Sequence, residues 1–445
     1  MKIAIITLGC DKNTVDSEYM AGILSAENHE IFTQEIPDDI DVVIINTCGF
    51  IHDAKEQSID EIMSWIHFKE TTDHKLKIVV YGCLAQRYAE DILKEIPEID
   101  AVIGVGETAN ISQILNQVME TKGKTYLTKS PEMIIKQEIP RQALDEKPYG
   151  FLKISDGCDY ACSFCAIPKI KGPYRSVSPQ ILLNEAKQLL DRGAKEINII
   201  AQDTGAYGKD LNNGYNLTKL LKEICKLEGD FWVRLFYLYP SNINDELIYL
   251  IANEPKICKY IDIPFQHISD DILRKMRRQE SSNDIYDLIE KLRSRVKGIA
   301  IRTTFLIGFP GESKDAFIKL TDFIRSSRLE RFGAFAYSDE EGTHAYTLDD
   351  KINRSTILGR MNEFNKLQEE IYLANNDERI DEVVKVLIEE YNEQSGLFIA
   401  RSQSEAPDID PIILVKSDEE LPIGSFQTCK IIDADCFELY AEIIN

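Results

Sequence analysis

Residues 151–176, FLKISDGCDYACSFCAIPKIKGPYRS, combine a short strand pattern with three cysteines in the loop that follows it. FLKIS (151–155) is typical of a β-strand, and Cys158, Cys162 and Cys165 come directly after it. A 4Fe–4S cubane has four irons, and each iron takes one external ligand. Three thiolates would therefore leave one iron open for a small molecule. A structural zinc site with a distant fourth ligand, or a chance group of buried thiols, would use the same residues differently.

Outward from this stretch, residues 144–374 alternate strand and helix patterns. The segments between the strands, such as PQILLNEAKQLLDRG and KDAFIKLTDFIRSS, have helical spacing. Six β/α units predict a partial (β/α)6 barrel, whose chemistry lies at the carboxyl ends of the strands. The three cysteines follow the first of these strands. The predicted strands are FLKIS (151–155), EINIIA (196–201), FWVRLFYL (231–238), YIDIPF (260–265), IAIRTTFLI (299–307) and RFGAFAY (331–337).

Residues 1–120 have a shorter alternation, with predicted strands at 3–7, 41–46, 77–82 and 101–104. This pattern predicts a small parallel α/β sheet. Cys10, Cys48 and Cys83 each follow one of its strands, and ligands of open parallel sheets lie beyond the carboxyl ends of the strands. Widely spaced cysteines are often just small core residues. Their common position favours a second cluster with an open iron, and we interpret Cys225, Cys258, Cys429 and Cys436 as packing residues.

Two further segments complete the predicted α/β organisation. Residues 121–143 lose the periodicity and are interpreted as a linker. A helical pattern at 354–376 leads into residues 375–445, where short strands and turn signals predict a small all-β barrel or sandwich. Residues 376–445 have 17 acidic side chains against five Lys and Arg, a net charge of −12. This segment therefore supplies half of the chain's net charge of −24.

The bulk composition limits the possible partners and compartments. The acidity of the chain argues against nucleic acid as the primary partner and favours a basic protein. The first residues lack a signal-peptide pattern, and no window approaches the apolar length of a membrane helix. Ten cysteines without export signals are typical of a reducing compartment, so we expect a cytoplasmic protein that does not enter a membrane.

The cysteine spacing of residues 157–165 resembles the signature of the radical S-adenosylmethionine (SAM) superfamily. TLGCDKNTVDSE, INTCGF and YGCLAQRY resemble the amino-terminal domain of its methylthiotransferase family, and IGFPGES and FAYSDEEGTHAY resemble later barrel segments. The final block resembles the TRAM domain of that family. The resemblance implies an enzyme with two 4Fe–4S clusters and SAM, which converts an unactivated C–H bond to C–S–CH3. One SAM would supply the methyl group and another the radical.

The resemblance also implies residues that contact SAM. Phe164 is expected near the adenine. Gln202 follows the second barrel strand, where relatives bind the methionine or ribose part, although this chain lacks the usual Gly-Glu-Glu there. Gly308 in IGFPGES could let the backbone approach SAM or could simply form a turn, and Glu312 is a further candidate. No catalytic residue is assigned beyond the cluster ligands.

Two branches of the family compete for the substrate: one modifies a tRNA adenosine, and the other the β-carbon of an aspartate in the twelfth protein of the small ribosomal subunit. CDKNTVDSE and RSQSEAPDIDPIILV resemble the second branch, with Asp11 in place of the usual proline. The acidic TRAM domain fits a basic ribosomal protein. A reductant such as flavodoxin or ferredoxin is expected. A non-enzymatic iron–sulfur sensor or carrier is the alternative of another class.

Overall fold

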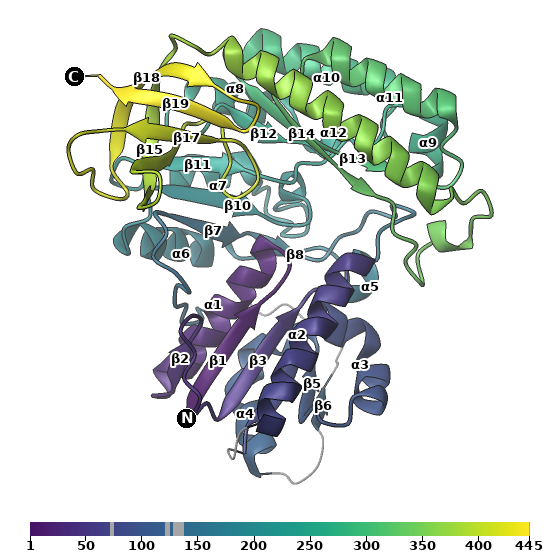
Figure 1. The fold of residues 1–445 in the computed structure, drawn as a ribbon, viewed down its shortest axis with the longest axis vertical. Helices are drawn as coiled ribbons and strands as arrows, with labels where there is room; N and C mark the ends of the chain where they lie inside the picture. Colours follow the sequence, from purple (N-terminus) through teal and green to yellow (C-terminus); the bar gives the residue numbers. More distant parts are fainter. Residues whose placement is uncertain (72–74, 121–124, 128–137, 445) are drawn as a thin grey trace. The chain divides into compact units, whose positions relative to one another are not determined.

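The amino-terminal part of the chain forms the predicted parallel sheet in the computed structural model (Figure 1). The structure describes residues 1–71, 75–120, 125–127 and 138–444. In this described part, the strand order is β2-β1-β3-β4-β5-β6, and every neighbouring pair is parallel. The strands are β1 (Lys2–Thr7), β2 (Glu30–Phe32), β3 (Val42–Thr47), β4 (Lys77–Gly82), β5 (Ala101–Ile103) and β6 (Thr125–Leu127).

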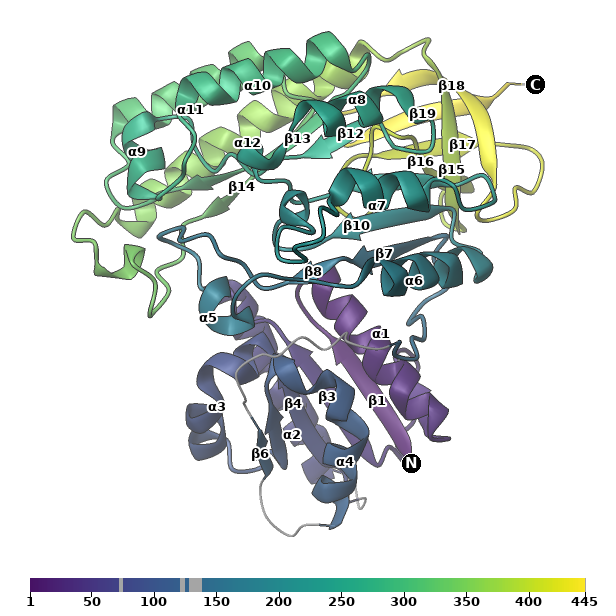
Figure 2. The ribbon, with the colours of Figure 1, turned by 180° about the vertical axis from the view of Figure 1, so that it is seen from behind.

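Helices cover both faces of this sheet, because successive strand residues point to opposite sides. The helices are α1 (Asp11–Ala26), α2 (His52–Thr71), α3 (Cys83–Glu95) and α4 (Ile111–Glu120). Ile3 and Ile5 pack with α1 and α4 on one face (Figure 2). Ala4 packs with α2 and α3 on the other (Figure 1). With both faces covered, all residues of β3 are buried, which explains its continuous VVII run.

Strands β2 and β6 were not predicted from the sequence. Each has only three residues and begins with a polar one, whereas the equally short β5 has the apolar run AVI. Strand β6 pairs with β5 and lies inside residues 121–143, the segment predicted as a linker. Residues 121–124 and 128–137 of that segment lie outside the described residues. The other predicted domain boundaries, 1–120, 144–374 and 375–445, stay predictions.

All six strands predicted for the partial barrel are present. They form two three-stranded sheets, with the orders β11-β10-β7 and β12-β13-β14. Strands β11 and β12 are shorter than predicted, because Tyr237 adopts a positive φ of 57° and Pro264 cannot donate a ladder hydrogen bond. The strands are β7 (Tyr149–Lys153), β10 (Glu196–Ile200), β11 (Trp232–Leu235), β12 (Tyr260–Asp262), β13 (Ala300–Ile307) and β14 (Arg331–Ala336).

The helices of this region include those predicted at PQILLNEAKQLLDRG, KDAFIKLTDFIRSS and residues 354–376. They are α6 (Pro179–Asp191), α7 (Leu217–Ile224), α8 (Asp245–Asn253), α9 (Asp270–Lys275), α10 (Ser282–Arg295), α11 (Lys314–Ser327) and α12 (Arg354–Asp377). Among the described residues, no helix combines the length and apolar character needed to cross a membrane.

The chain divides into two compact units that do not follow the order of the sequence. Unit 1 consists of residues 1–146 with two later segments, 153–181 and 338–346. Unit 2 consists of residues 147–152, 182–337 and 347–445. The loop after the first barrel strand and the loop after the last one therefore belong to the amino-terminal unit.

The carboxyl-terminal residues form a closed five-stranded barrel with the order β15-β16-β17-β19-β18. Its core is a single apolar cluster that includes Val386, Ile413 and Leu439. Closure leaves no open strand edge in this small domain. The strands are β15 (Val383–Asn392), β16 (Leu397–Arg401), β17 (Ile412–Lys416), β18 (Phe426–Ala434) and β19 (Glu438–Ile443).

Within unit 2, buried ion pairs join this small barrel to the amino ends of the β10–β14 strands. Glu196, the first residue of β10, pairs with Arg234 at 2.8 Å and with Arg401 at 3.2 Å. Arg331, the first residue of β14, pairs with Glu405 at 2.9 Å. The side chains of four of these residues are at most 1% exposed: Glu196, Arg234, Arg401 and Glu405. Such pairs hold because each buried charge meets an opposite charge.

Asp410, which lies in the same segment of the chain as Arg401 and Glu405, also contacts the β10–β14 strands. Its carboxylate accepts a hydrogen bond from the Tyr260 hydroxyl at 2.7 Å and lies 3.5 Å from the Arg302 guanidinium. Burial acts to raise the pKa of Glu405, but Arg379 and Arg331 lower it to about 2. Glu405 therefore stays ionised near neutral pH, and residues 401–410 bind the barrel through Arg401, Glu405 and Asp410.

Candidate metal centre

Cys10, Cys48 and Cys83 lie at one edge of the unit 1 sheet, as the sequence predicts. Cys10 is the N-cap of α1, shortly after β1. Cys48 follows β3, and Cys83 is the first residue of α3, directly after β4. Strands β1, β3 and β4 are consecutive neighbours in the sheet. The three thiols are therefore brought to the carboxyl ends of three adjacent parallel strands.

Glycines next to these cysteines let their loops approach closely. A Cβ atom added to Gly9 would lie 2.7 Å from Cys48 Cβ and 3.2 Å from Cys48 Sγ. A Cβ atom added to Gly49 would lie 2.7 Å from Leu84 Cα and 2.9 Å from the Cys83 carbonyl carbon. A larger side chain at either position would push the cysteines apart. Sequence reasoning missed this, although the pairs Gly9–Cys10, Cys48–Gly49 and Gly82–Cys83 are its signal.

Burial makes two of these thiols poor acids without a nearby cation. It raises the pKa of the Cys83 thiol to about 12, while the Lys171 ammonium acts against that shift. It also raises the pKa of Cys48, and the neighbouring Cys10 acts in the same direction. Only the thiolate ligates a metal, so iron binding here must displace protons. A cationic cluster is a suitable occupant because it supplies the positive charge that the thiolates need.

The loop that carries Cys158, Cys162 and Cys165 is closed at its base by a short antiparallel pair. Strand β8 (Ser155–Asp156) pairs with β9 (Arg175–Ser176). The Cys158 amide donates to the Gly172 carbonyl at 3.1 Å, and the Cys165 amide donates to the Cys162 carbonyl at 3.1 Å.

Gly157 is required at the start of this loop. Its φ is +77°, and an added Cβ would lie 2.0 Å from the Pro173 oxygen. The backbone of the cysteine loop is thus fixed by its own hydrogen bonds and by this close approach.

A short helix after Cys165 packs on the thiol edge of the sheet. The helix is α5 (Ile167–Lys171), and Ile170 and Ala166 share an apolar cluster with Cys83. Lys171 Nζ lies 3.1 Å from Asp16 Oδ2 in α1. Both sets of three cysteines therefore belong to one unit, and contacts within that unit join them.

A buried charge network joins the cysteine loop to α1. Asp16 is 1% exposed and pairs with Lys153 as well as Lys171. Asp156, at the start of the loop, lies 3.9 Å from each of the two ammonium groups. Two cations thus meet two carboxylates, which satisfies charges that would be costly to bury alone.

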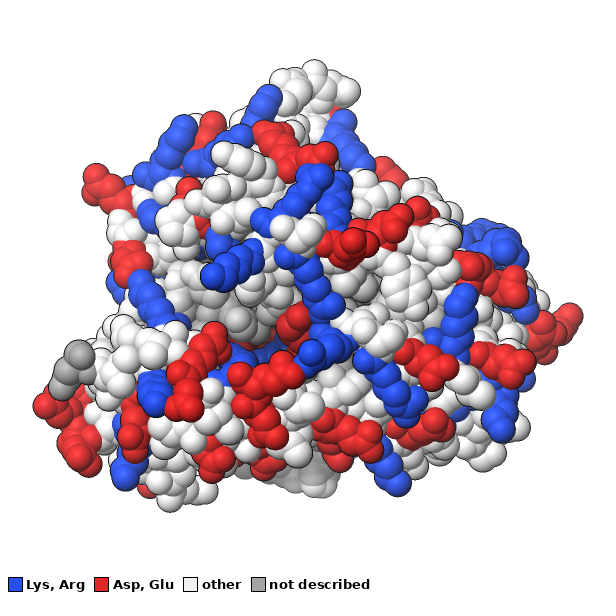
Figure 3. Space-filling model, turned by 90° about the horizontal axis from the view of Figure 1, so that it is seen from above, with Lys and Arg blue, Asp and Glu red and all other residues white. Residues whose placement is uncertain are grey.

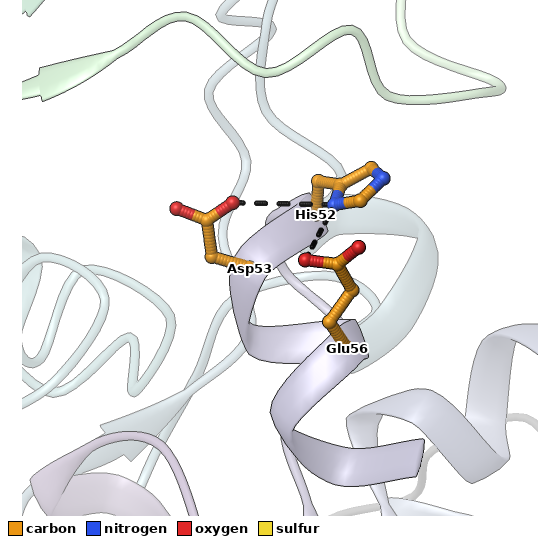
Figure 4. A group of neighbouring side chains, drawn as sticks. All are labelled: His52, Asp53 and Glu56. Carbon is orange, nitrogen blue, oxygen red and sulfur yellow. Dashed lines mark ion pairs between the residues drawn. The ribbon is translucent and has the colours of Figure 1, made fainter. Parts of the chain in front are cut away.

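A group without cysteines has its possible metal-ligand atoms within 4.8 Å of one another. His52, Asp53 and Glu56 lie at the start of α2 (Figure 4). Their side chains are 64%, 94% and 67% exposed, and the histidine nitrogen lies 3.9 and 3.4 Å from the two carboxylates. Iron–sulfur clusters favour soft thiolate ligands, and this group offers none. The two cysteine sets match the donor chemistry of a cluster, whereas this exposed group does not.

Two predicted SAM contacts lie at different places. Phe164 is half-buried in the cysteine loop of unit 1, and Gln202 lies two residues after the end of β10 in unit 2. The side-chain oxygen of Gln202 is buried and has no hydrogen-bond partner among the described residues. A buried acceptor of this kind is costly unless a ligand donates to it. The ammonium or hydroxyl groups of SAM could do so, and the contacts of both residues with SAM stay predictions.

Gly308 and Glu312 brace the loop after β13. The Gly308 amide donates to Glu312 Oε2 at 2.8 Å, and Arg360 pairs with Glu312 Oε1 at 2.5 Å. Gly308 has a φ of +84°, and an added Cβ would lie 2.4 Å from Ile357 Cγ1 in α12. The glycine is therefore needed for the turn and for packing. A role of either residue in binding SAM stays a prediction.

His267 lies beside Glu312, with its Nε2 3.7 Å from Oε2. Burial lowers the pKa of His267 to about 3, so the ring is neutral near pH 7. Its Nδ1 accepts a hydrogen bond from the Ser269 amide at 2.9 Å. The ring is therefore a buried, neutral group that is hydrogen-bonded through Nδ1, while its Nε2 has no hydrogen-bond partner among the described residues.

Comparison with family descriptions divides the chain into three matched regions. Residues 2–104 match the Uncharacterized protein family UPF0004. Residues 152–324 match the radical SAM superfamily, and residues 380–444 match the TRAM domain. The three regions correspond to the parallel sheet, the partial barrel and the small closed barrel.

Full-length relatives and solved structures agree with this division. The chain is similar to the ribosomal protein uS12 methylthiotransferase RimO of Acetivibrio thermocellus, with 41% identity over 100% of this chain and 98% of the relative. The corresponding protein of Thermoanaerobacter sp. is 42% identical over 99% of each chain. Among solved structures, the radical SAM methyltransferase TsrM of Kitasatospora setae has a TM-score of 0.55 at 15% identity, covering 75% of this chain and 74% of its own. This last likeness concerns the fold alone.

Proposed function

The chain belongs to the RimO family of ribosomal protein uS12 methylthiotransferases, and from this membership we infer that it transfers a methylthio group to uS12 as a radical SAM enzyme. The acceptor we propose is the β-carbon of an aspartate. One SAM supplies the methyl group and another the radical. A carbon without an acidic hydrogen cannot be activated by a base, which is why radical chemistry suits this reaction.

The observation that carries this proposal is the presence of six cysteines in one compact unit. Cys158, Cys162 and Cys165 would hold the 4Fe–4S cluster that binds SAM and supplies the electron for its cleavage. Cys10, Cys48 and Cys83 would hold a second 4Fe–4S cluster, which supplies the place where sulfur is kept for transfer. Each set provides three thiolates, so each leaves one iron free for another ligand.

The protein's own residues orient these groups. The β8–β9 pair and the Asp16 network fix the cysteine loop against α1. Gly9 and Gly49 let the second set of thiols converge. Gln202 offers a buried acceptor at the carboxyl end of β10. Fixed positions matter because the substrate radical must meet sulfur within bonding reach.

The substrate protein meets the enzyme, in this proposal, through exposed acidic side chains of the TRAM domain. Glu405 and Asp410 are not available for docking, because they pair with arginines of the same unit. The exposed set comprises Asp381, Glu382, Glu390, Glu393, Asp408, Asp418, Glu419, Glu420, Asp433, Asp435 and Glu442. Exposed lysines are few there, so the surface can attract a basic ribosomal protein.

Acidic and basic side chains are interspersed on the face drawn in Figure 3. A mixed surface of this kind gives weak steering of a charged partner. We assign docking to the exposed acidic residues of the TRAM domain, and we expect the enzyme to act in the cytoplasm with flavodoxin or ferredoxin as its reductant.

The experiment that tests this function combines two measurements on the reconstituted protein. Release of 5′-deoxyadenosine from SAM under strong reductant tests the radical reaction and would separate an enzyme from an iron–sulfur sensor or carrier. Peptide mass spectrometry of uS12 then tests the transfer, which adds one CH2S unit to an aspartate. Absence of that increment, with a tRNA adenosine modified instead, would overturn the choice of substrate.

A further inference from the structure

Residues 338–346 leave the barrel and join the other unit. They follow β14, a strand of unit 2, yet they belong to unit 1 with both sets of cysteines. We call this segment the strap. Its sequence is SDEEGTHAY. Although it supplies no thiol, its contacts reach the loops on which the cysteines lie.

One part of the strap contacts residues that follow Cys48 and Cys83 in the sequence. Glu340 pairs with Arg87 and with Lys55, at 2.8 Å in each case. Arg87 lies in the helix that begins at Cys83, and its NH1 also donates to the Gly49 carbonyl at 2.6 Å. One guanidinium thus connects the Cys83 helix, the Cys48 loop and the strap.

The Glu340 carboxylate is held firmly in this position. Its side chain is 3% exposed, and its Oε1 accepts a hydrogen bond from the Ser338 hydroxyl at 2.7 Å. The Glu340 carbonyl accepts another from the Thr343 hydroxyl at 2.7 Å. Removing the carboxylate charge would leave two cations facing a largely buried site without a counter-charge.

The other part of the strap contacts the loop of Cys158, Cys162 and Cys165. The Ala345 amide donates to the Ser163 carbonyl at 2.7 Å, and Ser163 lies between two of these cysteines. Gly342 has a φ of +78°, and an added Cβ would lie 3.1 Å from Lys169 Nζ in α5. The strap therefore contacts, within a single short segment, the elements that carry both sets of cysteines.

We propose that the strap sets the separation of the two cysteine sets and that Glu340 is its positioning residue. Glu340 contacts neither a thiol nor a reacting group in this arrangement; it acts through Arg87. The proposal rests on the proposed function, because spacing matters only if sulfur must pass from one site to a radical formed at the other. Small displacements of reacting groups are costly for such a step.

The test compares Glu340→Gln with Glu341→Gln. The two residues are neighbours in the strap, but the side chain of Glu341 is exposed, so the second variant controls for the loss of one negative charge. Pulsed EPR on the doubly reduced holoenzyme would measure the dipolar coupling between the clusters. The same preparations would give the amount of 5′-deoxyadenosine formed per methylthiolated uS12.

We expect the Glu340→Gln variant to bind both clusters and to cleave SAM. The distribution of the dipolar coupling between its two clusters should become broader. The 5′-deoxyadenosine formed per product should rise roughly tenfold or more, and Glu341→Gln should match the unaltered protein. An unchanged coupling and an unchanged ratio would overturn the proposal. The coupling is measured without substrate, so it tests the strap even if uS12 proves not to be the acceptor.

A second variant keeps the test decisive if Glu340→Gln does not fold. Arg87→Lys retains the positive charge but cannot bond Gly49, Glu340 and the Glu341 carbonyl together. The proposal predicts that this variant has the same broadened distribution of dipolar couplings and the same rise in 5′-deoxyadenosine formed per product. If Arg87→Lys also fails to fold, or folds with normal coupling, the strap only stabilises the fold and the positioning role is wrong.

Discussion

The two ends of the β10–β14 strands in unit 2 use polar residues in opposite ways. At the amino end, Glu196, Arg234, Arg401 and Glu405 form buried ion pairs that seat the TRAM domain. At the carboxyl end of β10, the buried oxygen of Gln202 has no hydrogen-bond partner among the described residues. Asp410 Oδ1 and Arg331 Nε at the amino end also lack a hydrogen-bond partner in the described part of the chain, but their side chains form ion pairs there, whereas the Gln202 side chain is uncharged. Paired charges fix the fold at the amino end, and the unpaired Gln202 acceptor is the candidate place for a ligand at the carboxyl end.

The largest expected effect on activity comes from replacing the cysteines that are proposed to hold the two clusters. Cys162→Ala should abolish SAM cleavage, because one iron of the SAM-binding cluster loses its ligand. Cys48→Ala should leave cleavage of SAM but abolish transfer to uS12. Chromatography of 5′-deoxyadenosine and mass spectrometry of uS12 distinguish the two losses. Transfer that persists in Cys48→Ala would contradict the role of the second set.

At the amino end of the β10–β14 strands, Glu196→Gln should reduce the stability of the protein rather than its activity. It leaves Arg234 and Arg401 buried without their carboxylate, a change that costs roughly 3–5 kcal/mol for a buried pair. Thermal unfolding should therefore begin at a lower temperature. Glu390→Gln, which removes an exposed carboxylate of the TRAM domain, is the matched control and should leave the unfolding temperature unchanged.

Activity below the unfolding temperature separates the two ends. For Glu196→Gln we expect methylthiolation per folded molecule within about twofold of the unaltered protein, since Glu196 pairs with two arginines and contacts no group that is proposed to react. A large drop in kcat with normal thermal stability would show that the amino end also serves the reaction.

Gln202→Ala should have the reverse effect. Loss of one hydrogen bond to a charged group weakens binding by roughly 1.5–3 kcal/mol, so the Kd for SAM should rise about tenfold or more. Thermal stability without SAM should not fall, because the lost oxygen has no partner in the described structure. Equilibrium dialysis with SAM and a thermal scan of the same preparation would check both. Unchanged SAM binding would remove Gln202 from the site.

The smallest effect is expected at the exposed TRAM surface. Replacing Asp418, Glu419 and Glu420 by their amides should raise the KM for uS12 a fewfold and flatten its dependence on salt, because exposed charges act through screened attraction. Steady-state kinetics at several ionic strengths would measure this. If the KM for uS12 neither rises nor becomes less dependent on salt, these residues are not part of the docking surface.

Local patterns were enough to predict much of this structure from the sequence. Strands such as VVIIN and KIVVYG can be recognised by their short apolar runs. Because the carboxyl ends of parallel strands lie at one edge of the sheet, these strands predict that Cys10, Cys48 and Cys83 lie at the same edge. The six barrel strands followed in the same way. Strands β2 (EIF) and β6 (TYL) were missed because each is short and begins with a polar residue, whereas the equally short β5 (AVI) is apolar throughout.

Contacts between distant parts of the chain could not be predicted. Lys153 meets Asp16 across 137 positions, and Arg87 meets Glu340 across 253 positions. No spacing rule relates such residues, so the membership of the strap in unit 1 was not foreseen. The same limit applies to Glu405, whose charge was counted toward docking although it pairs with Arg331.

The most direct test of the central claim is the iron content and Mössbauer spectrum of a protein in which Cys158, Cys162 and Cys165 are all replaced by Ala. The account predicts that this variant retains one 4Fe–4S cluster on Cys10, Cys48 and Cys83, with half of the iron of the unaltered protein. A variant that binds no cluster, or an unaltered protein with iron for only one, would contradict the claim that the two sets of thiols hold separate clusters.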